Sequence, residues 1–206
     1  MGLTRETAAL ATDAPLHSDG GRVVALAGNP NVGKSTVFNA LTGMHQHTGN
    51  WSGKTVGCAA GKCDIDGTCF TLVDLPGCYS LLSHSAEEEA ARDMLCRGEA
   101  DLAVVVCDAT CVERNLNLAL QIREIIPRTI LCINLMDEAS GRGIRIDAMG
   151  LAKTLGIPVV LTAAGKKQGL EELLKQDTYK IIWLVKDAGT ASTLPAAIHP
   201  CKIGSL

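Results

Sequence analysis

Gly28-Asn29-Pro30-Asn31-Val32-Gly33-Lys34-Ser35 is the stretch that decides the fold of this chain. It fits the phosphate-binding pattern G-x-x-x-x-G-K-[ST] at every fixed position. The apolar run Val23–Ala27 before it predicts a buried strand, and Lys34–Leu41 after it predicts a helix. The two glycines let the backbone turn so that its N–H groups converge on phosphate oxygens, and the positive end of the helix adds to the attraction. We expect Lys34 to reach the outer phosphates of a nucleotide and the Ser35 hydroxyl to bind Mg²⁺.

Strand and helix patterns alternate along the rest of the chain. Further strands are expected at Cys58–Ile65, Cys69–Val73, Leu102–Cys107, Thr129–Ile133 and Pro158–Leu161. Further helices are expected at Ser85–Cys96, Asn115–Ile126, Ile146–Leu155 and Gly169–Leu174, whereas Gly43–Thr55 is predicted to be a long loop. The strands are almost wholly apolar, and the pair Asp66-Gly67 is typical of a hairpin turn. The sequence therefore predicts an α/β P-loop NTPase G domain, with a mostly parallel six-stranded sheet, one antiparallel edge strand and helices on both faces.

The composition limits the kind of protein and its partners. Hydrophobic residues make up 47% of the 206 residues and charged residues 20%, which is a globular balance. The net charge of −3 gives no reason to expect a nucleic-acid partner, because phosphate backbones attract basic surfaces. No apolar run approaches the roughly 20 residues that cross a bilayer, and no secretory signal pattern is visible. We divide the chain into a flexible lead-in (1–21), a G domain (22–175) and a C-terminal extension of undefined structure (176–206).

The chain contains nine cysteines, and no export signal accompanies them. We interpret them as reduced thiols in a reducing cytoplasm. Cys58, Cys63 and Cys69 are spaced like neither a zinc knuckle nor a C-x-x-C pair, which disfavours a metal site among them and Cys78.

Asp74 and Gly77 form the second motif, Asp-x-x-Gly, at the end of an apolar strand. A carboxylate at this edge of an open α/β sheet can hold Mg²⁺ through water. The backbone N–H of Gly77 can then sense the γ-phosphate of a nucleotide. A threonine of the preceding polar loop could complete the Mg²⁺ shell, and the residues alone leave Thr48 and Thr55 as alternatives.

Asn134-Leu135-Met136-Asp137 follows the expected strand Thr129–Ile133 and forms the third motif. The Asp137 carboxylate can accept N1–H and N2–H₂ of guanine, a donor pair that adenine lacks, so it would select GTP over ATP. Asn134 would brace the neighbouring loops and the base. After the last strand, Ala163 and Ala164 could add a backbone N–H to guanine O6.

These motifs resemble the cytosolic G domain of the FeoB family, which are bacterial ferrous iron transporters. The resemblance covers about residues 22–175. It is carried by the phosphate loop through Thr36, by Leu72–Leu81, by Asn134–Asp137 and most specifically by Thr48–Val56, which contains Gly-Asn-Trp-Ser-Gly. The general GTPases do not share that loop.

The resemblance implies roles for several residues. It indicates Thr55, rather than Thr48, as the Mg²⁺-binding threonine, and Asn31 as the ligand of a potassium ion that acts like an arginine finger. Cys78 occupies the position of a water-orienting glutamine in Ras-like enzymes, and a thiol cannot hold water in that way, so slow turnover is expected. The resemblance also implies a membrane-embedded iron permease domain or protein as partner, and a location at the cytoplasmic face of the cell membrane.

The predicted catalytic residues are Lys34, Asn31, Thr55 and Gly77, and the predicted metal ligands are Ser35, Thr55 and Asp74 for Mg²⁺ and Asn31 for K⁺. The predicted nucleotide-binding residues are Gly28, Asn29, Pro30, Asn31, Val32, Gly33, Lys34, Ser35, Thr36, Gly53, Lys54, Thr55, Asp74, Leu75, Pro76, Gly77, Asn134, Leu135, Met136, Asp137, Thr162, Ala163 and Ala164.

The chain departs from the family's pattern in three respects. The long membrane domain that would carry iron is absent, residues 176–206 lack the helical pattern that usually follows the G domain, and the cysteines are more numerous than the motifs need. A truncated chain, a natural stand-alone G domain and a tail foreign to the fold all fit this pattern. The leading hypothesis is a G domain that hydrolyses GTP for ferrous iron uptake. The alternatives are a ribosome- or RNA-associated GTPase, against which the acidic balance argues, and a GTP-sensing module with negligible turnover. An ATP-using kinase or ATPase conflicts with Asp137.

Overall fold

The computed structural model describes residues 22–43, 47–49, 58–65, 68–82 and 85–169. Several sequence expectations lie outside these ranges, among them the lead-in 1–21, most of the helix predicted at Gly169–Leu174 and the extension 176–206. Gly53, Lys54 and Thr55 also lie outside the described residues.

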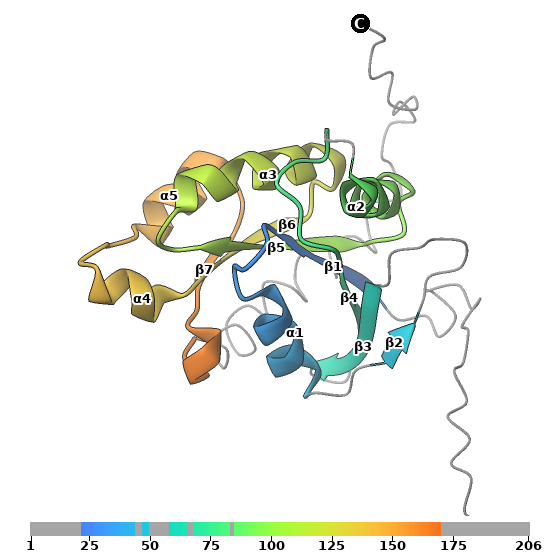
Figure 1. Cartoon of the computed structure of the whole chain (residues 1–206), viewed down its shortest axis with the longest axis horizontal. Helices are drawn as coiled ribbons and strands as arrows, with labels where there is room; N and C mark the ends of the chain where they lie inside the picture. Colours follow the sequence, from blue (N-terminus) through green and yellow to red (C-terminus); the bar gives the residue numbers. More distant parts are fainter. Residues whose placement is uncertain (1–21, 44–46, 50–57, 66–67, 83–84, 170–206) are drawn as a thin grey trace, which may run out of the picture.

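The described residues form an α/β fold around a single seven-stranded sheet with the order β2-β3-β4-β1-β5-β6-β7. The strands are β1 (Arg22–Gly28), β2 (His47–Gly49), β3 (Cys58–Ile65), β4 (Thr68–Asp74), β5 (Leu102–Asp108), β6 (Thr129–Asn134) and β7 (Val159–Leu161). Figure 1 shows the sheet nearly edge-on, with the short β2 beside β3 at one end. The mostly parallel α/β architecture predicted from the sequence is confirmed.

The sheet contains one strand more than expected. Five strands, β4, β1, β5, β6 and β7, run parallel, and β3 is antiparallel to β4 with Ala60 opposite Val73. The additional strand β2 lies inside the segment predicted to be a loop and pairs antiparallel with β3, Thr48 opposite Ala59. Three residues are too few to show an alternating pattern, so only the pairing with β3 defines this strand.

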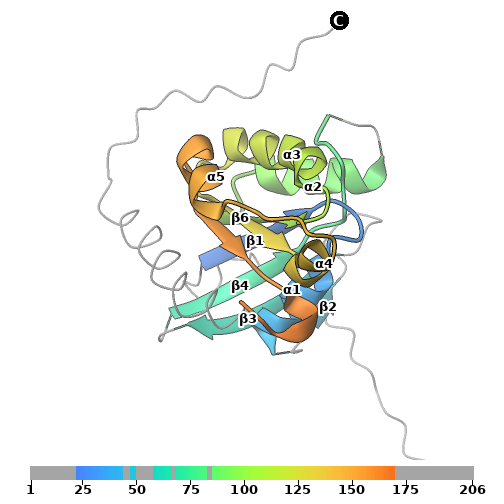
Figure 2. The same ribbon diagram turned by 90° about the vertical axis from the view of Figure 1, so that its left-hand side faces the viewer.

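Helices cover both faces of the sheet, as the views in Figures 1 and 2 agree. The helix α1 (Lys34–Thr42) packs on one face through Val37 and Phe38. The opposite face is covered by α2 (Ala86–Cys96), α3 (Val112–Ile125), α4 (Met136–Gly141) and α5 (Ala148–Leu155). A 3₁₀ turn, η1 (Ala164–Lys166), follows β7 on the α1 side. The helix α3 begins three residues earlier than expected, α5 begins two residues later, and α4 was not predicted.

The aliphatic core follows from the alternation of side chains along the central strand. In β1, Val23, Ala25 and Ala27 face the layer that contains α2 and α3, whereas Val24 and Leu26 face α1. All five are buried, as expected for a strand with helices on both sides. This arrangement buries the end of β1, from which the phosphate loop begins.

The described cysteines form no disulfide with one another, and Cys78, Cys107 and Cys132 among them are buried. Among the residues that the structure describes, no group of three or more metal-ligating side chains comes together. The helices in this part of the chain are all too short or too polar to cross a membrane.

Candidate nucleotide-binding site

The predicted site residues gather where the parallel strands end. Gly28 closes β1, Asp74 closes β4 and Asn134 closes β6, while Thr162 follows β7 directly. Parallel strands bring their carboxyl ends to the same edge, so four segments that are far apart in the sequence meet there.

The phosphate loop has the backbone conformation that its motif requires. Gly33 lies in the left-handed region, with φ 80°, and caps the N-terminus of α1, whose first turn closes with a 3.0 Å bond from the Val37 N–H to the Gly33 carbonyl. Asn31 is also left-handed, with φ 65°, a conformation that asparagine tolerates better than most residues. A Cβ on Gly28 would approach the carbonyl oxygen of Val106 to 2.5 Å, so only glycine fits between β1 and β5 at this position.

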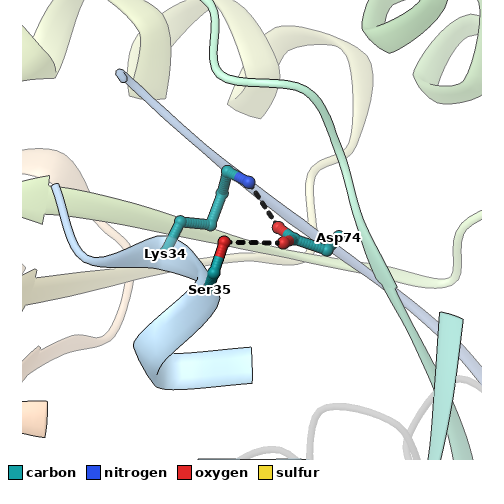
Figure 3. A network of polar contacts seen from close by, with 3 residues as sticks. All are labelled: Lys34, Ser35 and Asp74. Atoms are coloured by element: carbon teal, nitrogen blue, oxygen red, sulfur yellow. Dashed lines mark hydrogen bonds and ion pairs between the residues drawn. The ribbon is translucent and has the colours of Figure 1, made fainter. Parts of the chain in front are cut away.

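The carboxylate of Asp74 joins both polar side chains at the start of α1. One of its oxygens accepts a hydrogen bond from the ammonium of Lys34, and the other accepts from the Ser35 hydroxyl at 3.2 Å (Figure 3). The Lys34 and Asp74 side chains are only 10% and 12% exposed. A partly buried ion pair needs good geometry to offset the loss of hydration. These contacts bring the Lys34 ammonium, the Ser35 hydroxyl and the Asp74 carboxylate next to one another.

These oxygen donors fit a magnesium ion. Mg²⁺ prefers hydroxyl and carboxylate oxygens, and Ser35 and Asp74 present one of each within 3.2 Å. The phosphate loop contributes a further polar feature, because the Asn29 side chain is 4% exposed and its Oδ1 has no hydrogen-bond partner among the described residues. Asn31 is exposed on the same loop, so its amide is accessible to an ion beside the phosphates.

The segment after β4 packs against the phosphate loop. The N–H of Leu75 donates to the Leu26 carbonyl at 2.9 Å, and the N–H of Cys78 donates to the Gly28 carbonyl at 3.2 Å. A Cβ on Gly77 would lie 3.1 Å from the Cα of Pro30. The Asp-x-x-Gly turn therefore contacts the phosphate loop directly.

Cys78 points into the core rather than toward the loop surface. Its side chain is 2% exposed and belongs to the cluster that contains Ala91 and Leu95 of α2. Burial, with a smaller contribution from Glu88, raises the pKa of the Cys78 thiol to about 11. The thiol therefore stays protonated at neutral pH and is shielded from solvent.

Asn134 ties together the loops on the opposite side of the site. Its Nδ2 donates to the Val32 carbonyl of the phosphate loop at 3.0 Å. Its Oδ1 accepts two bonds of 3.0 Å, from the Thr162 hydroxyl and from the Ala164 N–H. Asn134 is 1% exposed, so it connects the neighbouring loops from inside the protein, and its predicted contact with the base stays a prediction.

The N–H groups of Ala163 and Ala164 are both engaged within the protein. Ala163 donates to the Gln168 carbonyl at 3.0 Å and Ala164 donates to Asn134. Their assignment to guanine O6 therefore stays a prediction. Asp137 lies in the first turn of α4, and its carboxylate pairs with Lys166 of η1 at 3.1 Å.

Two sets of contacts could not be predicted from the motifs. The first is the ion pair between Lys166 and Asp137, because nothing in the sequence around Lys166 distinguishes it from other lysines. The other connects the segment after Asp74 with α3: the Gln121 Oε1 accepts from the Leu81 N–H at 2.8 Å and from the Ser80 hydroxyl at 3.3 Å, and Arg114 lies 4.7 Å above the Tyr79 ring. Long side chains that reach across two elements leave no periodic signal in the sequence.

Comparison with known proteins places this geometry in a family. The family model described as ferrous iron transport protein B matches residues 22–177. The chain belongs to the FeoB family. It is 41% identical over 162 residues to the Fe(2+) transporter FeoB of Escherichia coli K12, a match that covers 76% of this chain and 21% of that relative. The chain thus spans about a fifth of the length of the curated FeoB relatives it matches.

Solved FeoB structures share the fold. The crystal structure of the G domain of the Thermotoga maritima FeoB iron transporter superimposes with a TM-score of 0.72 at 44% identity, and the match covers 81% of this chain and 98% of that one. The cytosolic domain of the same transporter in a GDP form gives a TM-score of 0.74 at 44% identity, covering 86% of this chain and 67% of that one. The described part of the chain therefore corresponds to a FeoB G domain.

Proposed function

We propose that this chain binds Mg²⁺·GTP and hydrolyses it to GDP and phosphate, as the G domain of a ferrous iron uptake system. The observation that carries the proposal is the Asp74 carboxylate, which contacts both Lys34 and Ser35 at the end of β4. In this arrangement a cation for phosphate, a hydroxyl and a carboxylate for Mg²⁺ lie within hydrogen-bond reach of one another.

The phosphate end of the site divides its roles among a few groups. The backbone of 28–33 would cradle the phosphates, and Lys34 would leave Asp74 to contact the β- and γ-phosphates. The N–H of Gly77 would donate to the γ-phosphate, because this glycine already lies against Pro30. Thr36, Gly53, Lys54, Leu75 and Pro76 are further predicted contacts with the nucleotide.

Metal ions would act at the same end. Ser35 and Asp74 would hold Mg²⁺, with Thr55 as the third predicted ligand, and Asn31 would hold K⁺. A bound cation offsets the negative charge that develops on the transferring phosphate. We therefore propose that potassium stimulates hydrolysis.

The base end would select guanine through Asp137, since a carboxylate accepts the N1–H and N2–H₂ pair that adenine cannot donate. Asn134 would hold the base loop against the phosphate loop through its bond to Val32. The two ends of the nucleotide would thus be read by one connected set of loops.

Turnover is proposed to be slow. Cys78 stands where a water-orienting group is expected, and its thiol is buried and protonated, so it can neither orient the attacking water nor accept its proton. The same observation favours a second candidate function, a GTP-sensing module with negligible turnover.

The partner is proposed to be a membrane-embedded iron permease domain or protein at the cytoplasmic face of the membrane. The family relationship supports such a partner. The matched relatives are Fe(2+) transporters, and this chain covers only about a fifth of their length. We also propose residues 22–175 as the extent of the G domain.

Titration of the chain with fluorescent mant-GTP and mant-ATP tests the function. We expect tight binding of GTP, weak binding of ATP, and loss of GTP binding by a factor of about 100 or more in Lys34→Ala. Binding of ATP in preference to GTP would overturn the proposal.

Single-turnover hydrolysis in KCl and NaCl tests the catalytic roles. Faster hydrolysis in KCl, with the difference lost in Asn31→Ala, would support the potassium site, and equal rates in both salts would reject it. Hydrolysis no faster than in buffer, with intact GTP binding, would favour the sensing module.

A further inference from the structure

Lys166 forms an ion pair with the carboxylate that is proposed to read the base. Its Nζ lies 3.1 Å from Oδ2 of Asp137, and the two side chains are 60% and 25% exposed. Exposed ion pairs contribute little to folding, so this contact has little weight as a stabilising interaction. Its position beside the base loop calls for a functional explanation.

The backbone around Lys166 is held firmly enough to direct its side chain. The Lys166 N–H donates to the Ala163 carbonyl at 2.9 Å, and Ala163 and Gln168 exchange hydrogen bonds of 3.0 and 3.3 Å across the turn. A Cβ on Gly169 would collide with the Leu161 carbonyl, so the end of the turn is packed against the end of β7. The turn at residues 163–169, which we call the platform, is therefore fixed in position. The Lys166 side chain extends from it to α4.

The loop that carries Asp137 is joined to the same platform. The Met136 N–H donates to the Thr162 carbonyl at 3.1 Å, and the Ala164 N–H donates to Asn134 at 3.0 Å. These bonds fix the backbone on both sides, while the Asp137 side chain can still rotate. The ion pair with Lys166 restricts this rotation of the Asp137 side chain.

We propose that Lys166 is a positioning residue for guanine recognition: it holds the Asp137 carboxylate in the orientation in which both of its oxygens accept the two N–H donors of guanine. A carboxylate offers about four lone-pair positions, so an ammonium on Oδ2 leaves enough of them for the base. The inference rests on the proposed function, since it needs a guanine nucleotide in the site.

The charge environment agrees with this role. The hydrogen bond from Lys166 is the first of the contributions that lower the pKa of Asp137 below its usual value. Glu138 is next to it on α4 and pairs with Arg142 at 3.8 Å. The contact with Lys166 therefore favours the charged form of the carboxylate, in which both oxygens act only as acceptors.

The test compares three nucleotides in three variants of the full chain by calorimetric titration. GDP donates both N–H groups, IDP lacks the N2 amine, and ADP cannot donate the pair. The variants are Lys166→Met, Lys166→Arg as the conservative replacement, and Lys167→Met, which removes the same charge from the neighbouring residue.

We expect Lys166→Met to weaken GDP binding about five-fold, because the substitution removes one charge-assisted hydrogen bond to Asp137. The loss should be smaller for IDP, and ADP binding should not change. Lys166→Arg and Lys167→Met should bind all three nucleotides as the wild type does. An equal loss for all three nucleotides would mean a merely structural role and would overturn the inference.

Two other outcomes also overturn it. Tighter GDP binding in Lys166→Met would show that the lysine competes with the base for the carboxylate. Unchanged GDP binding in that variant, with a wild type that prefers GDP to ADP, would reject the inference and leave the proposed function intact. A wild type without any preference for GDP would instead reject the proposed function, and the inference with it.

Discussion

Asn134 donates a 3.0 Å hydrogen bond from its side chain to the backbone carbonyl of Val32, and so connects the loop after β6 to the phosphate loop. The other side-chain atom of Asn134 accepts from Thr162 and Ala164, which belong to a third loop. One buried amide thus fixes the relative positions of three loops that come from separate parts of the sequence.

Replacing Asn134 by Ala leaves the Val32 carbonyl, the Thr162 hydroxyl and the Ala164 N–H without their partner. We expect the free energy of unfolding to fall by about 2–4 kcal/mol, because buried polar groups without hydrogen bonds are costly. Urea unfolding measures this change, and GDP titration should show weaker binding in parallel. Asn117→Ala on the exposed face of α3 is the control, with an expected change within about 0.5 kcal/mol. Similar losses in both variants would contradict the bracing role.

Gly77→Ala should separate the Asp-x-x-Gly turn from the phosphate loop. The added Cβ would lie 3.1 Å from Cα and 3.2 Å from N of Pro30, and backbone atoms cannot rotate away from it. We expect GTP hydrolysis to fall by about tenfold or more, since displacements of this size misplace reacting groups, while GDP binding changes little. Gly141→Ala, where an added Cβ meets no atom within 4 Å, provides the matched control. Full hydrolysis by Gly77→Ala would show that the close packing is not needed.

Cys78 should make stability depend on alkaline pH. Its thiol keeps its proton up to about pH 11 in the folded protein, whereas the ordinary thiol value is 9.0. Between these pH values the folded state binds more protons than the unfolded state, so stability falls as pH rises from about 9 through 11. Unfolding free energies measured from pH 8 to 11 should show a shallower fall in Cys78→Ala than in the wild type. Cys96→Ala, at an exposed thiol, should follow the wild type; identical slopes in all three would contradict the burial of Cys78.

Gln121 should restrain the segment that follows the Asp-x-x-Gly turn. Gln121→Ala removes the acceptor of the Leu81 N–H, and we expect that amide to exchange its hydrogen about five-fold faster, which corresponds to about 1 kcal/mol. Hydrogen exchange followed by NMR measures this rate. Glu124→Ala, on the exposed side of α3, should leave it unchanged. No acceleration in Gln121→Ala would mean that other contacts hold the segment.

The strong motifs could be located from the sequence because each depends on a few adjacent residues. The phosphate loop, the strand that ends at Asp74 and the Asn134 turn each show apolar runs ended by glycine or polar residues, and the structure brings all three to one edge of the sheet. The N-cap of α2 was also recognisable, since Ser85 accepts from the Glu88 N–H at 3.2 Å in the expected spacing.

Features that depend on partners distant in the sequence were missed. The strand β2 is defined by its pairing with β3, and three residues alone carry no strand pattern. The helix α4 is only six residues long and begins after Leu135, which adopts a left-handed conformation without being glycine. Lys166 contacts Asp137, which lies 29 residues earlier in the sequence, and Gln121 contacts Ser80, which lies 41 residues earlier. No spacing rule predicts contacts over such separations.

The pairing of β1 has a consequence for synthesis on the ribosome. Residues 22–26 pair with 70–74, and residues 24–28 pair with 102–106, so the strand that carries the phosphate loop has both its neighbours far downstream. Such non-local pairings form only after the intervening chain exists. A nascent chain that has emerged only to residue 100 therefore contains the whole phosphate-binding motif and still lacks one of the two strands that shape it. We therefore expect the phosphate loop to take its final shape only after β5 has been made.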